Sequence, residues 1–339
     1  MMRSLYSGIS GLKNHQTRMD VIGNNIANVN TVGYKTSRTI FQDIFSQTAK
    51  SGARNSVAYG GTNPVQIGLG IKLSTIDIMH TPAPIARTDN PFDMMISGDG
   101  FFIVGYVELD PAGDPILDIN GDMWRCYYTR AGNFTLDDEG YLTTSDGYYV
   151  LGYSVDLTLD ANGTIVPSDD SNAEYEGDPT VFGKLIVPDP YELDRIRLRV
   201  TPDGNEFNPS GTDYDPQDPD TYVDLLGFSV DDNGVVSVII GETKVAVAKI
   251  ALGMFSNFGG LEKAGNSLYR ETPSSGPVVR TEARLRGSGP ILGGGLEMSN
   301  VDLATEFTDM IVTQRGFQAN SRVITVSDTL LEELVNLKR

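Results

Sequence analysis

The sequence contains a single cysteine, Cys126, and only two histidines, His15 and His80, among its 339 residues. One cysteine excludes an intramolecular disulfide. So few histidines exclude most zinc sites and leave little acid–base chemistry near pH 7. The chain also lacks an apolar run of about 18 residues, so no membrane insertion is predicted. No continuous apolar stretch follows Arg3, so we expect no cleavable secretory signal.

Basic residues are scarce as well. The 26 lysines and arginines face 45 acidic residues, which gives a net charge of -19. Such a chain repels phosphate groups, so no nucleic acid partner is expected, and an anionic membrane surface is a poor partner too. The two ends of the chain carry net charges of opposite sign: +4 over residues 1–50 and -3 over residues 296–339. Most of the negative charge lies between about residues 105 and 235, which indicates a solvated acidic surface.

No pattern of catalytic or ligand-binding residues stands out. The fragments Gly68-Leu-Gly70 and Gly98-Asp-Gly100 lack the Lys-Ser/Thr or the helix of a phosphate-binding loop. The acidic stretches 118–122 and 156–163 lack the spacing and the closing Glu of a calcium loop, so surface turns explain them better. The prediction is no enzyme, with no catalytic, cofactor-binding or metal-binding residues and no cofactor.

The first thirty residues have the pattern of a helix. Apolar side chains recur every seven residues, with two more beside them, which is typical of an apolar seam of period 3.5. Glycines within this stretch each weaken an isolated helix by about 1 kcal/mol, so the segment should need a partner helix. The seam residues are Leu5, Ile9, Leu12, Met19, Ile22 and Ile26, and the glycines are Gly8, Gly11 and Gly23.

The last forty residues offer that partner. A 4-3-4-3 spacing runs over more than four heptads and predicts a long helix of coiled-coil type, which Asn300 or Asp302 can cap. Since the two ends carry seams and opposite charge, we expect them to pack together; the alternative is a helix on its own domain's core. The two rows are Leu303, Met310, Phe317, Ile324 and Leu331, and Phe307, Gln314, Ser321, Asp328 and Val335.

Between the helices, short β-branched and aromatic runs alternate with turn signals such as Asp231-Asp-Asn-Gly234. The predicted fold is a mainly β body of antiparallel sandwich or barrel-like domains, with paired terminal helices forming a coiled-coil-like domain. The run 286–295 is expected to be a flexible glycine joint. The expected divisions are 1–30 plus 298–339 as the terminal helical domain, 31–70 as a connecting loop segment, 71–153 plus 241–297 as a β-rich middle domain, and 154–240 as a small acidic outer domain.

Several motifs carry a resemblance to a known family. The stretch Val21-Ile-Gly-Asn-Asn-Ile-Ala-Asn-Val-Asn-Thr-Val-Gly-Tyr-Lys35 resembles the N-terminal signature of the bacterial flagellar rod and hook family. The stretch Glu297-Met-Ser-Asn-Val-Asp-Leu303, together with Gln314-Arg-Gly-Phe-Gln-Ala-Asn320, resembles its C-terminal signature. Tyr128-Thr-Arg-Ala-Gly-Asn-Phe134 is similar to a central motif. The resemblance covers both ends and most of the body.

Within that family, Gly60–Gly70 and the extra acidic residues resemble a hook protein, in a short form, rather than a distal rod protein. This resemblance implies a self-assembling subunit of a curved tube that acts as a universal joint and transmits torque from rod to filament. It implies export through the flagellar type III apparatus to an extracellular hook. The implied partners are the chain itself, the rod, the hook cap, the hook–filament junction proteins and the export apparatus.

The same resemblance gives roles to particular residues. The inner-tube helix contacts would be Leu5, Ile9, Leu12, Met19, Ile22, Ile26, Leu303, Phe307, Met310, Gln314, Phe317, Ile324 and Leu331. The N-terminal motif comprises Asn24, Asn25, Asn28, Asn30, Gly33 and Tyr34, whose polar side chains suit a cap and turn after the first helix. The C-terminal motif comprises Asn300, Val301, Asp302, Arg315, Gln318 and Asn320.

Two alternatives stay open. The first is a distal rod subunit of the same family, a straight tube. The second is a secreted glycan-binding or glycan-acting protein that uses a pair of carboxylates from the acidic region. With 45 acidic residues in the chain, any such pair is uninformative by itself.

Overall fold

The structure is a computed structural model. It describes residues 2–52, 54, 60–107, 124–137, 140–154, 157–159, 165–167, 174–176, 184–186, 193–196, 198, 227–240 and 243–337. Most of the predicted outer domain (154–240) lies outside the described residues, and so does the acidic stretch 118–122 of the predicted middle domain.

The chain divides into two compact units. The first, here called the helical unit, comprises Met1–Asn30, Lys35–Thr81 and Asn300–Arg339. The second, here called the β body, comprises Thr31–Tyr34 and Pro82–Ser299. The predicted combination of a mainly β chain with two terminal helices is confirmed.

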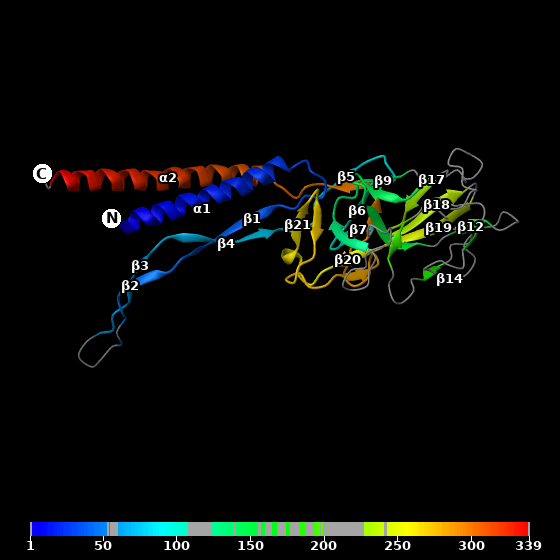
Figure 1. Cartoon of the computed structure of the whole chain (residues 1–339), viewed down its shortest axis with the longest axis horizontal. Helices are drawn as coiled ribbons and strands as arrows, with labels where there is room; N and C mark the ends of the chain where they lie inside the picture. Colours follow the sequence, from blue (N-terminus) through cyan, green and yellow to red (C-terminus); the bar gives the residue numbers. More distant parts are fainter. Residues whose placement is uncertain are drawn as a thin grey trace, which may run out of the picture. The chain divides into compact units, whose positions relative to one another are not determined.

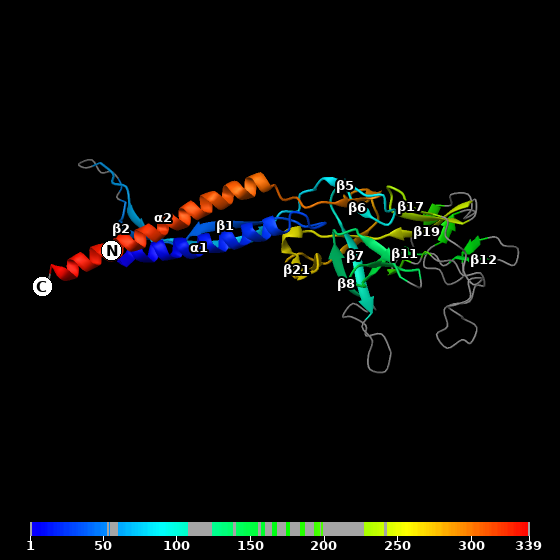
Figure 2. The ribbon, with the colours of Figure 1, turned by 90° about the horizontal axis from the view of Figure 1, so that it is seen from above.

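The two terminal helices lie side by side in the helical unit (Figures 1 and 2). They are α1 (Met2–Ala27) and α2 (Leu303–Asn336). Asp302 caps α2, because its side chain accepts a hydrogen bond from the Ala304 backbone N–H at 3.0 Å. That carboxylate also accepts from the Thr305 hydroxyl, and these bonds lower the pKa of Asp302. The contact between α1 and α2 confirms the expected pairing of the two ends.

The helical unit also contains two antiparallel pairs of strands, which were not predicted from the sequence. Residues 31–70 were expected to be a connecting loop, and that expectation is wrong for most of the segment. The strands are β1 (Ser37–Asp43), β2 (Ser46–Lys50), β3 (Val65–Gly68) and β4 (Ile71–Ile78). β1 pairs with β4 and β2 with β3, both antiparallel. The β1–β4 pair lies along α1, whereas every residue of β2 and β3 is exposed.

The β body is built from antiparallel strands, as predicted. A sheet of thirteen described strands runs in the order β17-β18-β19-β11-β7-β8-β22-β21, with β9, β10, β16, β20 and β23 attached to it. Four separate pairs are β5–β25, β6–β24, β12–β13 and β14–β15.

The strand bounds follow the chain. The N-terminal half contains β5 (Ile85–Arg87), β6 (Met94–Ile96), β7 (Phe101–Val107), β8 (Trp124–Thr129), β9 (Phe134–Leu136), β10 (Leu142–Thr144), β11 (Tyr149–Ser154), β12 (Leu157–Leu159), β13 (Ile165–Pro167), β14 (Glu174–Glu176), β15 (Lys184–Ile186) and β16 (Asp194–Arg195). The remainder contains β17 (Gly227–Val230), β18 (Val235–Ile240), β19 (Thr243–Ile250), β20 (Leu252–Met254), the short helix η2 (Phe258–Gly260), β21 (Glu262–Gly265), β22 (Leu268–Arg270), β23 (Val279–Thr281), β24 (Ile291–Gly293) and β25 (Gly295–Glu297).

The core of the β body explains why these runs are strands. Aromatic and β-branched residues of β7, β11, β18 and β19 are almost fully buried in one cluster, which includes Phe102, Val104, Val238 and Ile250. Such residues suit a pleated, buried surface. β17 pairs with β18, and β18 pairs with β19, so this end of the predicted outer domain, residues 227–240, belongs to the main sheet.

The glycine joint expected over residues 286–295 is not a free linker. β24 pairs with β6 and β25 pairs with β5. Ile291 is fully buried, and Gly289 lies so close to the Ser97 backbone that a Cβ has no room there. The glycines of this stretch therefore allow close packing of backbones, rather than free movement.

Candidate assembly site

The contact between α1 and α2 is antiparallel and largely polar. Arg18 donates to Asp309 at 3.0 Å across it, which is one realised pairing between the basic and the acidic end of the chain. Both side chains are partly exposed, so this ion pair stabilises the helices only slightly, by about 0–1 kcal/mol. The buried residues of α2 are Thr313 and Ser327. Small side chains therefore take a large part in the seam between the helices, beside apolar residues such as Ile22 and Ile324.

Glycines bring the two helices close together. A Cβ on Gly11 would lie 2.6 Å from the side-chain amide of Asn320, and one on Gly316 would lie 2.8 Å from the His15 ring. One on Gly8 would lie 3.4 Å from Ile324. Gly8 and Gly11, which weaken α1 as an isolated helix, therefore lie in its contact with α2. Their helix-propensity cost is offset by packing, which is the usual source of helix stability in proteins.

Gly316→Leu and Gly23→Ala should change the stability of the helix pair in opposite directions. A leucine at 316 has to displace the His15 ring, and overpacking of this kind costs about 1–3 kcal/mol. Gly23 has open space around it, so alanine there should stabilise the helix by about 0.5–1 kcal/mol. Thermal unfolding followed by far-UV circular dichroism measures both. Equal effects of the same sign would show that the glycines act only through helix propensity.

His15 lies against α2 and β1. Its ring packs edge-on against Phe41, with 6.3 Å between ring centroids, and its partly enclosed Nδ1 has no hydrogen-bond partner among the described residues. Burial, and then the charge of Arg18, lower the pKa of His15 below its ordinary value of 6.5. The neutral imidazole is therefore the form that fits the folded helical unit.

The helix pair should lose stability as the pH falls through about 6.5. The unfolded chain binds a proton at His15 more readily than the folded chain, so stability is complete above that pH and declines below it. His15→Phe should remove this part of the pH dependence. Burial raises the pKa of Glu306 above its ordinary value of 4.5. The stability that depends on this carboxyl is therefore lost as the pH rises through that lower range, which is the opposite direction to His15. Denaturation midpoints of α1 and α2 between pH 5 and 8 separate the two; an unchanged slope in His15→Phe would contradict the prediction.

Large apolar side chains cover the free flanks of α2. An apolar stripe recurs at steps of three and four residues and is exposed by 42% to 82%: Val323, Val326, Leu330, Leu334 and Leu337. On the other flank, Phe307 is 50% exposed and Ile311 58% exposed. An exposed apolar patch of this kind marks an interaction surface.

The predicted seam residues therefore divide between the two surfaces. Those of α1 are buried or half-buried except Ile9, which is 45% exposed: Leu5, Leu12, Met19, Ile22 and Ile26. In α2, Met310, Ile324 and Leu331 are half-buried, whereas Leu303, Phe307, Gln314 and Phe317 are exposed. The stripe from Val323 to Leu337 was not predicted. The heptad count follows the rows that start at Leu303 and Phe307, and the stripe belongs to neither of them.

Asparagines of the N-terminal motif fasten the helices to the strands. Asn25 is buried and donates to the Ser37 carbonyl at 2.9 Å and to Glu306 at 3.0 Å, while it accepts from the Ser37 N–H. Asn28 donates to Asn24, and Asn24 and Asn30 are exposed. Asn14, which was not predicted, donates to the Ile71 carbonyl at 2.8 Å. Only an unexpected polar residue on a helix face could have signalled that role.

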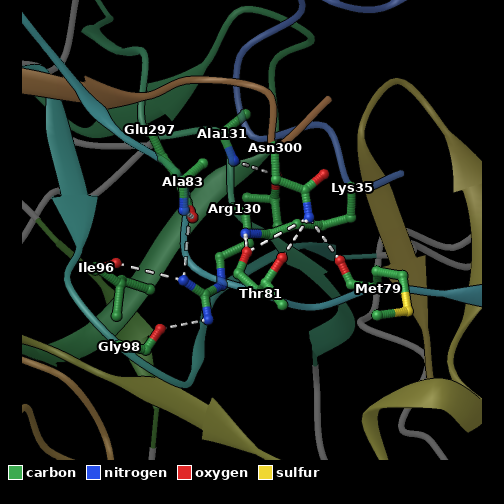
Figure 3. Close-up of polar contacts among 11 residues, drawn as sticks. Lys35, Met79, Thr81, Ala83, Ile96, Gly98, Arg130, Ala131, Glu297 and Asn300 are labelled. Atoms are coloured by element: carbon green, nitrogen blue, oxygen red, sulfur yellow. Dashed lines mark hydrogen bonds and ion pairs between the residues drawn. The ribbon is translucent and has the colours of Figure 1, made fainter. Parts of the chain in front are cut away.

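The rest of both motifs has mixed surroundings. Gly33 has a φ of 67°, a conformation that favours glycine, and a Cβ there would lie 2.7 Å from the Arg130 backbone. The Lys263 ammonium lies over the Tyr34 ring, 4.7 Å from the ring centroid, in a cation–π contact. In the C-terminal motif, Arg315 and Gln318 are exposed, and Val301 and Asn320 are half-buried. The Asn300 side chain accepts from the Thr36 N–H and donates to the Met79 carbonyl and the Thr81 hydroxyl (Figure 3).

Neither described helix has a stretch that is long and apolar enough to cross a membrane. Within the described residues there is also no group of three or more acidic, histidine or cysteine side chains that could hold a metal ion. The geometry offers paired helices, hydrogen-bonded asparagines and exposed apolar flanks, which define a β-rich protein that presents a helical interaction surface.

Comparisons with known proteins agree with this class and give the family. Three family descriptions match: "Flagella basal body rod protein" over residues 5–35, "Flagellar hook protein FlgE/F/G D1 domain" over 95–238 and "Flagellar basal body rod FlgEFG protein C-terminal" over 292–337. The chain belongs to the flagellar rod and hook protein family. These are structural proteins, not enzymes, and they give no support to the glycan-acting alternative.

Individual relatives include both rod and hook proteins. The chain is 40% identical over 341 residues to the flagellar basal-body rod protein FlgG of Bacillus subtilis, with 100% of both chains covered. It is 32% identical over 457 residues to the flagellar hook protein FlgE of Borreliella burgdorferi, also with full coverage of both. A solved structure of the Helicobacter pylori hook protein FlgE2 covers 63% of this chain at 12% identity, with a TM-score of 0.34.

Proposed function

We propose that this protein is a subunit of the flagellar axial tube that polymerises with copies of itself through its terminal helices. The exposed apolar stripe of α2 is the observation that carries the proposal, because a monomer leaves these five side chains in water. Burying them against neighbouring helices yields about 25 cal/mol for each Å² of apolar surface removed from water. The predicted seam residues, from Leu5 to Ile26 and from Leu303 to Leu331, would supply the remaining contacts.

Within the family, we infer a distal rod subunit in preference to a hook subunit. The length of the chain does not favour the hook, since the rod protein FlgG aligns over 341 residues with full coverage of both chains. The alignment with the hook protein runs over 457 positions, 118 more than the 339 residues of this chain. Large gaps are therefore needed only for the hook. A short hook subunit, which acts as a universal joint, is the second candidate, supported by the 32% identity.

The wider roles follow from that proposal. The partners would be further copies of the chain, neighbouring rod, hook-cap and junction subunits, and the flagellar export apparatus. The location would be the axial structure of the flagellum, reached through the export apparatus. An acidic outer domain starting near residue 154 stays a prediction.

Electron microscopy of the purified full chain after concentration and salting out tests the proposal. Straight, rigid tubes are expected for a rod subunit, and curved tubes would favour the hook. The same chain without residues 1–30 and 300–339 should remain monomeric. A monomer in both preparations at every concentration would refute assembly through the terminal helices.

A further inference from the structure

Aromatic and basic side chains gather on one face of the main sheet in the β body, where β7 lies between β8 and β11 (Figure 2). The register of β7 and β8 places Tyr106 directly opposite Arg125, and Val104 opposite Tyr127. Because side chains alternate between the two faces of a strand, these four lie on the same face. Val104 is fully buried in the core, whereas the two tyrosines are half-buried and Arg125 is exposed.

Two more strands widen this cluster. The ring of Tyr148, the residue before β11, lies 5.8 Å from the ring of Tyr106 and 5.7 Å from that of Tyr127, measured between centroids. The Tyr106 and Tyr127 rings stack with 6.3 Å between centroids. In β22, Arg270 follows the residue that pairs with Tyr128, so Arg270 lies beside Tyr127. The cluster, here called the tyrosine patch, consists of Tyr106, Arg125, Tyr127, Tyr148 and Arg270.

The tyrosine patch is held from below and is accessible from above. Tyr127 and Tyr148 pack against the buried core of the β body. The Arg270 side chain is 59% exposed, although it pairs with Glu262 at 2.8 Å. An exposed ion pair of this kind contributes little stability, so Arg270 exchanges readily to another carboxylate. Rings that are already fixed lose little conformational entropy when a partner covers them.

The composition of the patch indicates the chemistry of what covers it. Tyrosine and arginine are enriched in protein interfaces and among the residues that contribute most to binding. The rings offer apolar faces, and the guanidinium of Arg125 offers a planar fork for a carboxylate. The matching partner is therefore a surface with carboxylates beside apolar groups. Another copy of this chain supplies carboxylates in excess, since it has 45 acidic residues and a net charge of -19.

We propose that the tyrosine patch is a second contact between copies of this chain, in which it binds an acidic surface of a neighbouring copy. This inference rests on the proposed function, because the terminal helices first bring the copies together. A patch with two arginines does not pair with itself, so the contact is heterologous, as an open polymer requires. It depends partly on charge and weakens as salt is added, whereas the apolar stripe of α2 does not.

Zero-length crosslinking of the full-length protein tests this contact. Arg125→Lys keeps the positive charge and provides an amine, which a carbodiimide joins to a touching carboxylate as an amide while the carbodiimide takes up the water. Polymer is prepared from an equal mixture of chains with normal and heavy nitrogen, so mass spectrometry distinguishes crosslinks between copies from those within one. The introduced lysine should give several-fold more crosslinks between copies than Arg286→Lys, which alters an exposed arginine of the β body outside the patch.

Charge reversal at the same position gives an independent measure. Arg125→Glu should raise the critical concentration for assembly about tenfold at low salt, as expected for the loss of a central interface residue. The difference from the unmodified chain should shrink in concentrated sodium chloride, because salt screens the repulsion between the glutamate and the acidic partner. Arg286→Glu is the matched control and should assemble nearly as the unmodified chain does.

The outcomes separate this proposal from the proposed function. Polymer in which the introduced lysine gives no more crosslinks between copies than Arg286→Lys, or crosslinks only within its own copy, would overturn the contact and leave assembly through the terminal helices standing. Absence of polymer from the unmodified chain would refute the proposed function and this contact with it. Circular dichroism checks the fold of Arg125→Glu; if that variant does not fold, the crosslinks of Arg125→Lys decide.

Discussion

Val326→Asp should abolish tube formation and leave a folded monomer. Val326 is 57% exposed and lies in the middle of the apolar stripe on α2, so the aspartate costs the monomer little. In a polymer the same position would bury a charge in place of an apolar side chain, which costs several kcal/mol. A loss of about 3 kcal/mol per contact raises the critical concentration for assembly about a hundredfold.

Thr329→Asp is the matched control for this substitution. Thr329 lies three residues further along α2 and is exposed. Its replacement by aspartate adds the same charge outside the apolar stripe. It should assemble nearly as the unmodified chain does. Sedimentation of polymer over a concentration series measures the critical concentration, and circular dichroism checks that the monomer keeps its helices. Normal assembly of Val326→Asp would exclude the stripe from the polymer contact.

The division of α2 into two kinds of surface also shows what the sequence could predict. Periodicity located both helices to within a few residues, and the opposite charges of the ends indicated that they pair. Periodicity could not tell which row faces α1, because the facing side of α2 includes small residues such as Thr313, Gly316 and Ser327. These residues contribute close approach of the helices, which hydrophobicity patterns do not register.

The strands β1–β4 were missed for a related reason. Short strands with few buried residues, such as the exposed β2 and β3, differ little in composition from a loop. The buried ion pair of Arg130 and Glu297 could not be predicted either, since the two residues are 167 positions apart in the chain. The motifs that carried the family resemblance contain these residues, but a motif by itself does not give the pairing of its side chains.

Arg130→Met should destabilise the β body strongly, by about 3–5 kcal/mol, because it leaves Glu297 as a buried charge without its partner. Burial lowers the pKa of Arg130, against the opposing effect of Glu297, so desolvation outweighs the attraction within the pair. The expected loss therefore reflects the unpaired carboxylate more than the value of the ion pair. Urea denaturation followed by the fluorescence of Trp124, the single tryptophan, reports on this unit.

The double variant Arg130→Met/Glu297→Gln separates these two contributions. With no charge left buried, it should recover part of the stability lost in Arg130→Met, although the hydrogen bonds to the Ile96 and Gly98 carbonyls stay missing. Arg270→Met is the control on an exposed ion pair, that with Glu262, and should leave the stability nearly unchanged because solvent screens the pair. If Arg130→Met is no more destabilising than Arg270→Met, the buried pair does not stabilise the β body, and Glu297 acts there only through the hydrogen bonds that it accepts from the Gly33 and Ala83 backbone N–H groups.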